Sequence, residues 1–221
     1  MFIPSFCKMK LRFCFLCILT VVLGDHAWIA CGQETRRNAS YNLPSAAVYR
    51  GGLVSPPLPK PEFVLTDTSG ARFDFWKETR GSVTLLFFGY TTCPDQCPTH
   101  MANLAAALKR LPTGFADHVK LVFITTDPAR DSPVKLRRWL DNFDKRFVGL
   151  TGSDAALEAV QKSAGVPLAY KTEPTKRISP IAHANFVVAY TKDNLAHVIY
   201  PGGVTTEDWV HDLPLLTQQT Q

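Results

Sequence analysis

Apolar and polar positions alternate along the chain in blocks that predict strands and helices. SVTLLFFGY (82–90) is a continuous apolar run bounded by glycines, as expected for a central strand buried on both faces. HVKLVFITTD (118–127) predicts a second buried strand, and EFVLTDTSGARFDF (62–75) alternates around a turn signal, which predicts a hairpin. These three segments indicate a sheet.

Three segments between and after the strands have helical patterns. CPDQCPTHMANLAAALKRLP (93–112) has apolar residues at helical spacing and ends at a proline. In DSPVKLRRWLDNF (131–143), Ser132 is a suitable N-cap and Pro133 fits the first helical position. SDAALEAVQKSAG (153–165) begins with a capping serine and closes with a glycine. The pattern therefore alternates strands with helices.

The rest of the chain completes this order. FVGLTG (147–152) predicts a short strand, and NFVVAY (185–190) and LAHVIY (195–200) flank a turn as a strand pair. TTEDWVHDLPLL (205–216) predicts a terminal helix. Alternating strands and helices predict an α/β protein with a mixed central sheet flanked by helices. The order resembles the thioredoxin fold, with an extra N-terminal hairpin.

Composition and charge allow one globular domain and give no sign of nucleic-acid binding. The chain has 221 residues, 46% of them hydrophobic and 19% charged, with a net charge of +5. Part of this charge lies in the first 32 residues, and no basic stripe accompanies it. We expect an export signal or lipoprotein leader at 1–32, a tether and a loop leading into the domain at 33–60, and a thioredoxin-like domain at 61–221.

The N-terminus is typical of an export signal. Three basic residues precede FCFLCILTVVL (13–23), which is shorter than the roughly 20 apolar residues that span a bilayer. Translation could start at Met1 or Met9. WIACGQ (28–33) resembles a lipobox, so lipidation of Cys31 and simple cleavage nearby both stay open. We expect the mature protein on the periplasmic side of a bacterial inner membrane, at the membrane surface.

Two cysteines lie in the predicted domain, Cys93 and Cys97. A disulfide between them would close almost no loop and would constrain the unfolded chain little, so a functional pair is favoured. We expect Cys93 near the N-cap of the helix, Pro94 at its first position and Cys97 one turn in. Residues four apart share a helix face, and helix-terminal amides favour thiolates, so both thiols should be more acidic than free ones. Two such thiolates exchange disulfides or bind a soft metal.

A metal site needs a third ligand, and the histidines are the candidates. His183 precedes the strand that a thioredoxin-like sheet places beside the start of the active helix, which favours it. His100 lies three residues after Cys97, so its spacing leaves it open as a ligand. His118 and His197 fall at the far end or edge of the predicted sheet.

Three motifs carry a resemblance to a known family. The three stretches are LLFFGYTTCPDQCP, ITTDPARDSP and IAHANFVV. In order and spacing, they resemble the motifs of the Sco/SenC family, the thioredoxin-like copper chaperones of cytochrome c oxidase assembly. The resemblance covers about residues 50 to 216. It implies that the domain at 61–221 binds copper, as Cu(I) or Cu(II), on Cys93, Cys97 and His183, with the acidic Asp127 near the metal. Ala182 replaces the aspartate that usually precedes the histidine.

The resemblance implies a copper chaperone that delivers copper to the binuclear copper site of a cytochrome c oxidase subunit and meets other copper chaperones. An alternative is a thiol–disulfide reductase that uses Cys93 and Cys97 as a redox pair on the recipient's cysteines. A peroxidase of the peroxiredoxin type is disfavoured, because the PxxxT pattern before its cysteine is missing here. The recipient, the delivered oxidation state and the oligomeric state are left open by the sequence.

Overall fold

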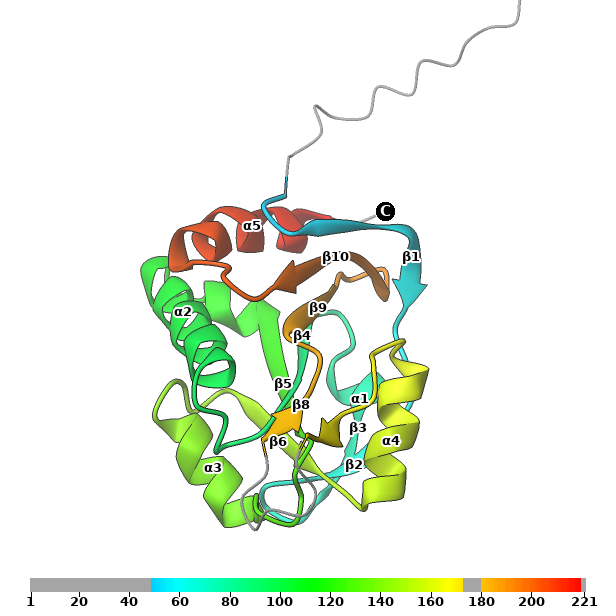
Figure 1. The fold of residues 1–221 in the computed structure, drawn as a ribbon. Helices are drawn as coiled ribbons and strands as arrows, with labels where there is room; N and C mark the ends of the chain where they lie inside the picture. Colours follow the sequence, from blue (N-terminus) through cyan, green and yellow to red (C-terminus); the bar gives the residue numbers. More distant parts are fainter. Residues whose placement is uncertain (1–48, 173–179, 220–221) are drawn as a thin grey trace, which may run out of the picture. The chain divides into compact units, whose positions relative to one another are not determined.

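The computed structural model describes residues 49–172 and 180–219, which contain a sheet of eight strands in the order β1-β10-β9-β4-β5-β6-β2-β3 (Figure 1). The strands are β1 (Gly52–Pro59), β2 (Val64–Asp67), β3 (Arg72–Asp74), β4 (Val83–Gly89), β5 (Val119–Thr125), β6 (Val148–Thr151), β9 (Phe186–Tyr190) and β10 (Leu195–Pro201). A separate pair is formed by β7 (Tyr170–Lys171) and β8 (Ile181–Ala182). The helices are α1 (Phe75–Glu78), α2 (Gln96–Arg110), the short 3₁₀ helix η1 (Phe115–His118), α3 (Pro133–Asp141), α4 (Asp154–Ser163) and α5 (Thr206–Gln218).

The centre of the sheet is the pair of apolar runs predicted to be central strands. Every residue of β4 is buried, and β4 pairs in parallel with β5 and antiparallel with β9. Strands covered on both faces need apolar residues at consecutive positions, which explains the unbroken run. Because β4 and β5 are parallel and in register at Gly89 and Thr125, their carboxyl ends lie side by side.

The structure confirms the helices whose capping residues were recognised in the sequence. Ser132 caps α3 by accepting a hydrogen bond from the backbone N–H of Lys135, and Pro133 opens the helix. Ser153 caps α4 in the same way. At α5, Thr205 and Asp208 form a reciprocal capping box.

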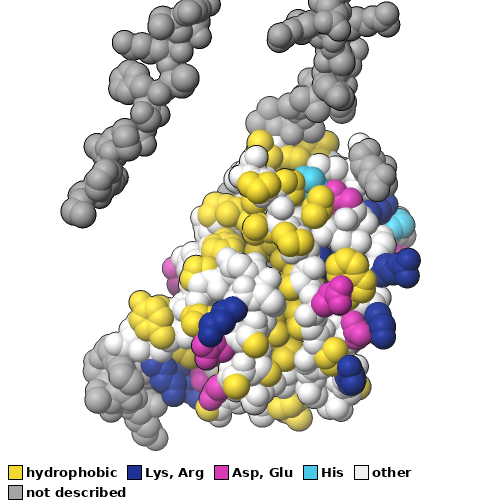
Figure 2. All heavy atoms as spheres, turned by 90° about the vertical axis from the view of Figure 1, so that its right-hand side faces the viewer, with side chains coloured by type: hydrophobic (Ala, Val, Ile, Leu, Met, Phe, Trp, Pro, Cys, Tyr) yellow, Lys and Arg dark blue, Asp and Glu magenta, His cyan; other side chains and the backbone are white. Residues whose placement is uncertain are grey.

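Two apolar clusters lie on opposite faces of the sheet. One face of the sheet packs against α2, α3 and α5, and the other against α1 and α4 (Figure 1). This layering, with the β2–β3 hairpin paired to β6 at the sheet edge, is the predicted thioredoxin-like α/β fold with an extra hairpin. The face on the α4 side carries a band of apolar side chains between charged ones (Figure 2).

The stretch 33–60, predicted as a tether and loop, differs from the prediction at its end. Residues Gly52–Pro59 form the edge strand β1, paired antiparallel with β10. The register shifts between Leu53 and Leu58, so Pro56 and Pro57 fall where the ladder is interrupted. Proline is tolerated in a sheet at edges and bulges, which is why its presence hid this strand from the pattern.

The predicted leader, with Met9 and Cys31, lies outside the described residues. In the part of the chain that the structure describes, none of the helices has the length and apolar character needed to cross a bilayer. Export and lipidation therefore remain predictions.

Candidate metal centre

The cysteine segment forms a tight turn between β4 and α2. The backbone N–H of Cys93 donates to the carbonyl of Tyr90 at 3.1 Å, and the first bond of the helix runs from Thr99 N–H to the carbonyl of Asp95. Asp95 is the N-cap, and α2 begins at Gln96. The helix thus starts two residues later than predicted, since residues 90–93 use their backbone groups to close the turn.

Cys93 therefore precedes the helix, while Cys97 is its second residue. The two side chains do not share a helix face, and the turn brings their sulfurs together instead. Cys97 is fully buried and Cys93 is half-buried, and both thiols are free. Gly89 makes room for Cys97, because a methyl group on Gly89 would lie 2.7 Å from its Sγ atom.

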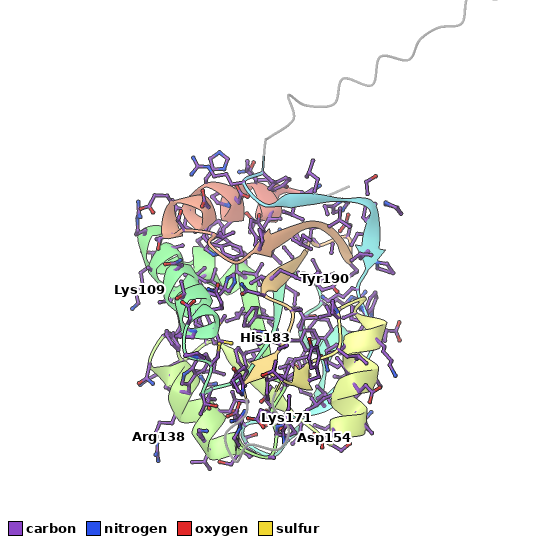
Figure 3. All side chains as sticks on the ribbon, viewed as in Figure 1. Lys109, Arg138, Asp154, Lys171, His183 and Tyr190 are labelled. Carbon is purple, nitrogen blue, oxygen red and sulfur yellow. The ribbon has the colours of Figure 1, made fainter. Side chains whose placement is uncertain are left out.

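His183 completes the cluster from a segment 86 residues further along the chain. It follows β8, and Figure 3 shows it beside α2 where the chain turns towards β9. Its Nε2 atom lies 3.5 Å from Sγ of Cys97 and 3.9 Å from Sγ of Cys93. Its Nδ1 atom lies 3.0 Å from the carbonyl oxygen of Ala184. Since that carbonyl can only accept, Nδ1 carries the proton and the Nε2 lone pair faces the sulfurs.

Two aromatic rings hold the imidazole of His183 from the side. Phe87 and Tyr90 contact it edge-on, with centroids at 5.9 and 5.6 Å. Both rings come from the buried strand and its continuation into the cysteine turn. The apolar run of the sequence thus also forms the wall of the site.

The two thiols differ in acidity, contrary to the prediction that both are acidic. The pKa of Cys93 is well below that of a free thiol, because the Cys97 thiol and the backbone amides of Asp95 and Cys97 hydrogen-bond to its sulfur. The pKa of Cys97 is raised, first by donating to Cys93 and then by burial. In the metal-free site Cys93 is the thiolate and Cys97 is the thiol.

The three side chains fit a soft metal ion. Their ligand atoms lie within 4.8 Å of one another, and this is the one such group of histidine, cysteine and acidic side chains among residues 49–172 and 180–219. Three ligand atoms at about 2.2 Å from a central ion in a trigonal arrangement are separated by about 3.8 Å. The observed 3.5 and 3.9 Å are close to that spacing.

The other histidines lie apart from this cluster. His100 is buried, and its Nε2 atom contacts Asn185 Oδ1 at 3.2 Å rather than a sulfur. His197 pairs with Asp193 at the hairpin turn between β9 and β10, and His211 pairs with Asp212 on α5. His118 ends η1, before β5. Of the two candidates for the third ligand, the structure brings His183 to the sulfurs.

Asp127 lies at the end of β5 and serves the turn that follows. Its carboxylate pairs with Arg130, and its carbonyl accepts from the amides of Arg130 and Asp131. The guanidinium of Arg130 lies over the ring of Tyr90, 5.7 Å from its centroid, and that ring contacts His183, so two side chains connect Asp127 with His183. A role for Asp127 in tuning the metal or meeting partners stays a prediction.

Sequence reasoning missed the importance of Asp131. This fully buried carboxylate accepts from the N–H of Thr91 at 2.9 Å, from its hydroxyl at 2.5 Å and from the hydroxyl of Thr125 at 2.8 Å. It ties the cysteine turn to the end of β5. In the sequence Asp131 directly precedes the N-cap Ser132, a position that indicates a role in helix capping. Only the tertiary contacts show that it binds the cysteine turn.

The fold and the cluster together define a thioredoxin-like protein with a candidate soft-metal site at the carboxyl end of β4. The family model described as SCO1/SenC matches residues 55–218, so the chain belongs to the SCO1/SenC family.

Similar proteins agree with this assignment. A putative copper-binding protein of Stutzerimonas stutzeri is 35% identical over 139 residues, covering 59% of this chain and 68% of that protein. A SCO2-like protein of Rickettsia felis is 37% identical over 99 residues, covering 45% of this chain and 47% of that protein, so the match spans about half its length. The solved structure of ScoI from Bradyrhizobium japonicum with copper bound has a TM-score of 0.64 at 31% identity, covering 72% of this chain and 99% of that one.

Proposed function

We propose that this protein binds one copper ion through Cys93, Cys97 and His183. The observation that carries the proposal is the convergence of two sulfurs and one imidazole nitrogen within 4.8 Å. Thiolates favour Cu(I), and the added imidazole allows Cu(II) to be held as well. On copper binding the Cys97 thiol would lose its proton to solvent, because the thiolate is the ligand form.

We further propose that the ion is cargo, delivered to the binuclear copper site of cytochrome c oxidase. Cys93 and His183 are partly exposed while Cys97 is buried, so an acceptor's ligands can approach from one side and replace the exposed ligands in turn. The resemblance to Sco/SenC motifs supports this recipient, other copper chaperones as partners, and a place at the membrane surface after export.

The acidity difference between the two thiols favours a second candidate, a thiol–disulfide reductase. The Cys93 thiolate would attack a disulfide of the recipient, forming a mixed disulfide and releasing one recipient thiolate. Cys97, once deprotonated, would then attack the Cys93 sulfur, releasing the second thiolate and leaving a Cys93–Cys97 disulfide. Two electrons pass to the recipient, and His183 is not required.

Copper stoichiometry and the Cu(II) absorption spectrum of the purified reduced protein test the two functions. We expect one copper per chain and a thiolate charge-transfer band. His183→Ala should remove the band and lower Cu(II) affinity at least about tenfold, because an inner ligand is lost. His197→Ala is the matched control, since it removes a histidine that pairs with Asp193 at the far hairpin turn.

Absence of copper binding, or a His183→Ala variant that matches the control, would reject the copper proposal. If His183→Ala still reduces a model disulfide at the parental rate while copper binding is absent from both proteins, the reductase is the better description.

A further inference from the structure

A directed chain of hydrogen bonds joins the His183 segment to the cysteine turn. His100 Nε2 lies 3.2 Å from Asn185 Oδ1, and Asn185 Nδ2 donates to Gln96 Oε1 at 3.0 Å. Gln96 Nε2 in turn donates to Asp95 Oδ2 at 2.7 Å. The chain begins inside α2, crosses to the residue two positions after His183, and returns to the residues between Cys93 and Cys97.

The protonation of His100 follows from its partner. Oδ1 of Asn185 can only accept, so Nε2 of His100 carries the proton and donates. Burial lowers the pKa of His100, which keeps the ring neutral. Its Nδ1 atom is buried without a hydrogen-bond partner among the described residues. The polar contact of this ring is therefore directed at Asn185.

A backbone hydrogen bond also holds Asn185 in place. Its carbonyl accepts from Gly202 N–H at 2.9 Å. A methyl group on Gly202 would lie 2.2 Å from Asn185 Nδ2 and 2.9 Å from Gln96 Oε1, so this approach requires glycine. The amide of Asn185 is thus fixed between α2 and the end of β10.

The ligand set itself comes from two distant segments. Cys93 and Cys97 belong to the turn before α2, whereas His183 stands between β8 and β9, held through its own side chain by the neighbouring Ala184 carbonyl. A shift of about 1 Å in that segment would spoil the three-atom geometry. The ring of His100 also packs 5.0 Å from Phe87, whose ring contacts His183.

We propose that His100 is a positioning residue for copper binding, which fixes His183 against the two cysteines through Asn185 and Gln96. This inference rests on the proposed copper function. Removing the chain should weaken Cu(II), whose binding depends on the imidazole, more than Cu(I), which the two thiolates hold.

Two substitutions at His100 separate the effect of its N–H donor from the effect of its ring size. His100→Phe keeps a ring against Phe87 but has no N–H, while His100→Gln places an amide donor near the same position. We expect His100→Phe to lower Cu(II) affinity about tenfold and to shift the charge-transfer band, as loss of contacts behind a ligand does. His100→Gln should restore both. Asn103→Ala is the matched control, because Asn103 also lies on α2 and donates across to the Val204 carbonyl.

A second readout needs no copper. The imidazole NMR signals of His183 in the reduced, metal-free protein should shift or broaden in His100→Phe and return in His100→Gln. Gln96→Ala, which breaks the chain at a partly exposed residue, should give the same change if His100→Phe fails to fold.

The outcomes distinguish this inference from the copper proposal. If the parent binds no copper, the proposed function fails, and the His183 signals alone decide the positioning role. The positioning role is overturned if His100→Phe leaves affinity and signals as in the parent. It is equally overturned if His100→Gln or Asn103→Ala changes them as much as His100→Phe does.

Discussion

The two sulfurs of the site have different chemistry because their surroundings differ. Cys93 is half-buried and accepts hydrogen bonds from the Cys97 thiol and from backbone amides. Cys97 is enclosed beside Gly89, where only a residue without a side chain leaves space for its sulfur. At the scale of single residues, the turn therefore makes one nucleophilic thiolate and one protected thiol.

This difference predicts selective alkylation of the metal-free protein. Iodoacetamide should modify Cys93 first, and its rate should stay nearly constant as the pH falls from about 8 to about 5. A free thiol, with a pKa of about 8.5, loses reactivity over that range because its thiolate disappears. The rate of Cys93 should stay nearly constant because its lowered pKa keeps the sulfur a thiolate over this pH range. Mass spectrometry of tryptic peptides at each pH measures both sites.

Cys97→Ala provides the control for the cause of that shift. Alanine has no group that can donate to the Cys93 sulfur, so the reactivity of Cys93 should fall at low pH more than in the parent. Equal modification of Cys93 and Cys97 in the parent at every pH would contradict the assignment.

At the scale of elements, the site depends on two parallel strands that end side by side. The N–H of Thr126, just after β5, donates to the Gly89 carbonyl at the end of β4 at 2.7 Å. Asp131, placed just before α3, then binds the cysteine turn at Thr91 and the strand at Thr125. One buried carboxylate thus joins β4, β5 and the start of α3.

Asp131→Ala should destabilise the fold by at least about 2 kcal/mol, because it leaves several buried donors without an acceptor. Asp141→Ala, which removes a carboxylate of α3 that pairs with Arg137 at the surface, should cost less than about 1 kcal/mol. Urea unfolding of the two variants measures both values. Equal stability of the two variants would show that the Asp131 contacts do not hold the turn.

At the scale of the whole molecule, a bound ion would join segments that the chain keeps far apart. The cysteine turn precedes α2, and His183 lies beyond β8 in the last quarter of the sequence. A ligand that binds only the folded state stabilises it by about 2.7 kcal/mol at a concentration a hundredfold above its dissociation constant.

Copper should therefore raise the melting temperature of the reduced protein and slow amide hydrogen exchange in both segments. A chelator that removes copper should reverse both effects. In His183→Ala, protection should be lost around residues 181–185 and kept in part at the cysteine turn. Protection of the cysteine turn alone in the parent would contradict binding by all three residues.

Much of the fold was predictable because local patterns and tertiary packing agree. The apolar runs became β4 and β5, and the capping residues Ser132 and Ser153 start α3 and α4. The motif pattern also indicated His183 over His100. The predicted start of α2 was two residues too early, because the turn at Tyr90–Cys93 competes with the helix for backbone hydrogen bonds.

The sequence by itself determined the order of elements, the burial of the central strands and the identity of the candidate ligands, since these follow from side-chain polarity, caps and motifs within a few residues. The tertiary structure alone decided that β1 pairs with β10, that Asp131 holds the cysteine turn, and that His100 reaches Asn185. It also decided which thiol is acidic. These features arise from contacts between residues distant in the chain, where burial and hydrogen-bond partners are set by packing rather than by neighbouring residues.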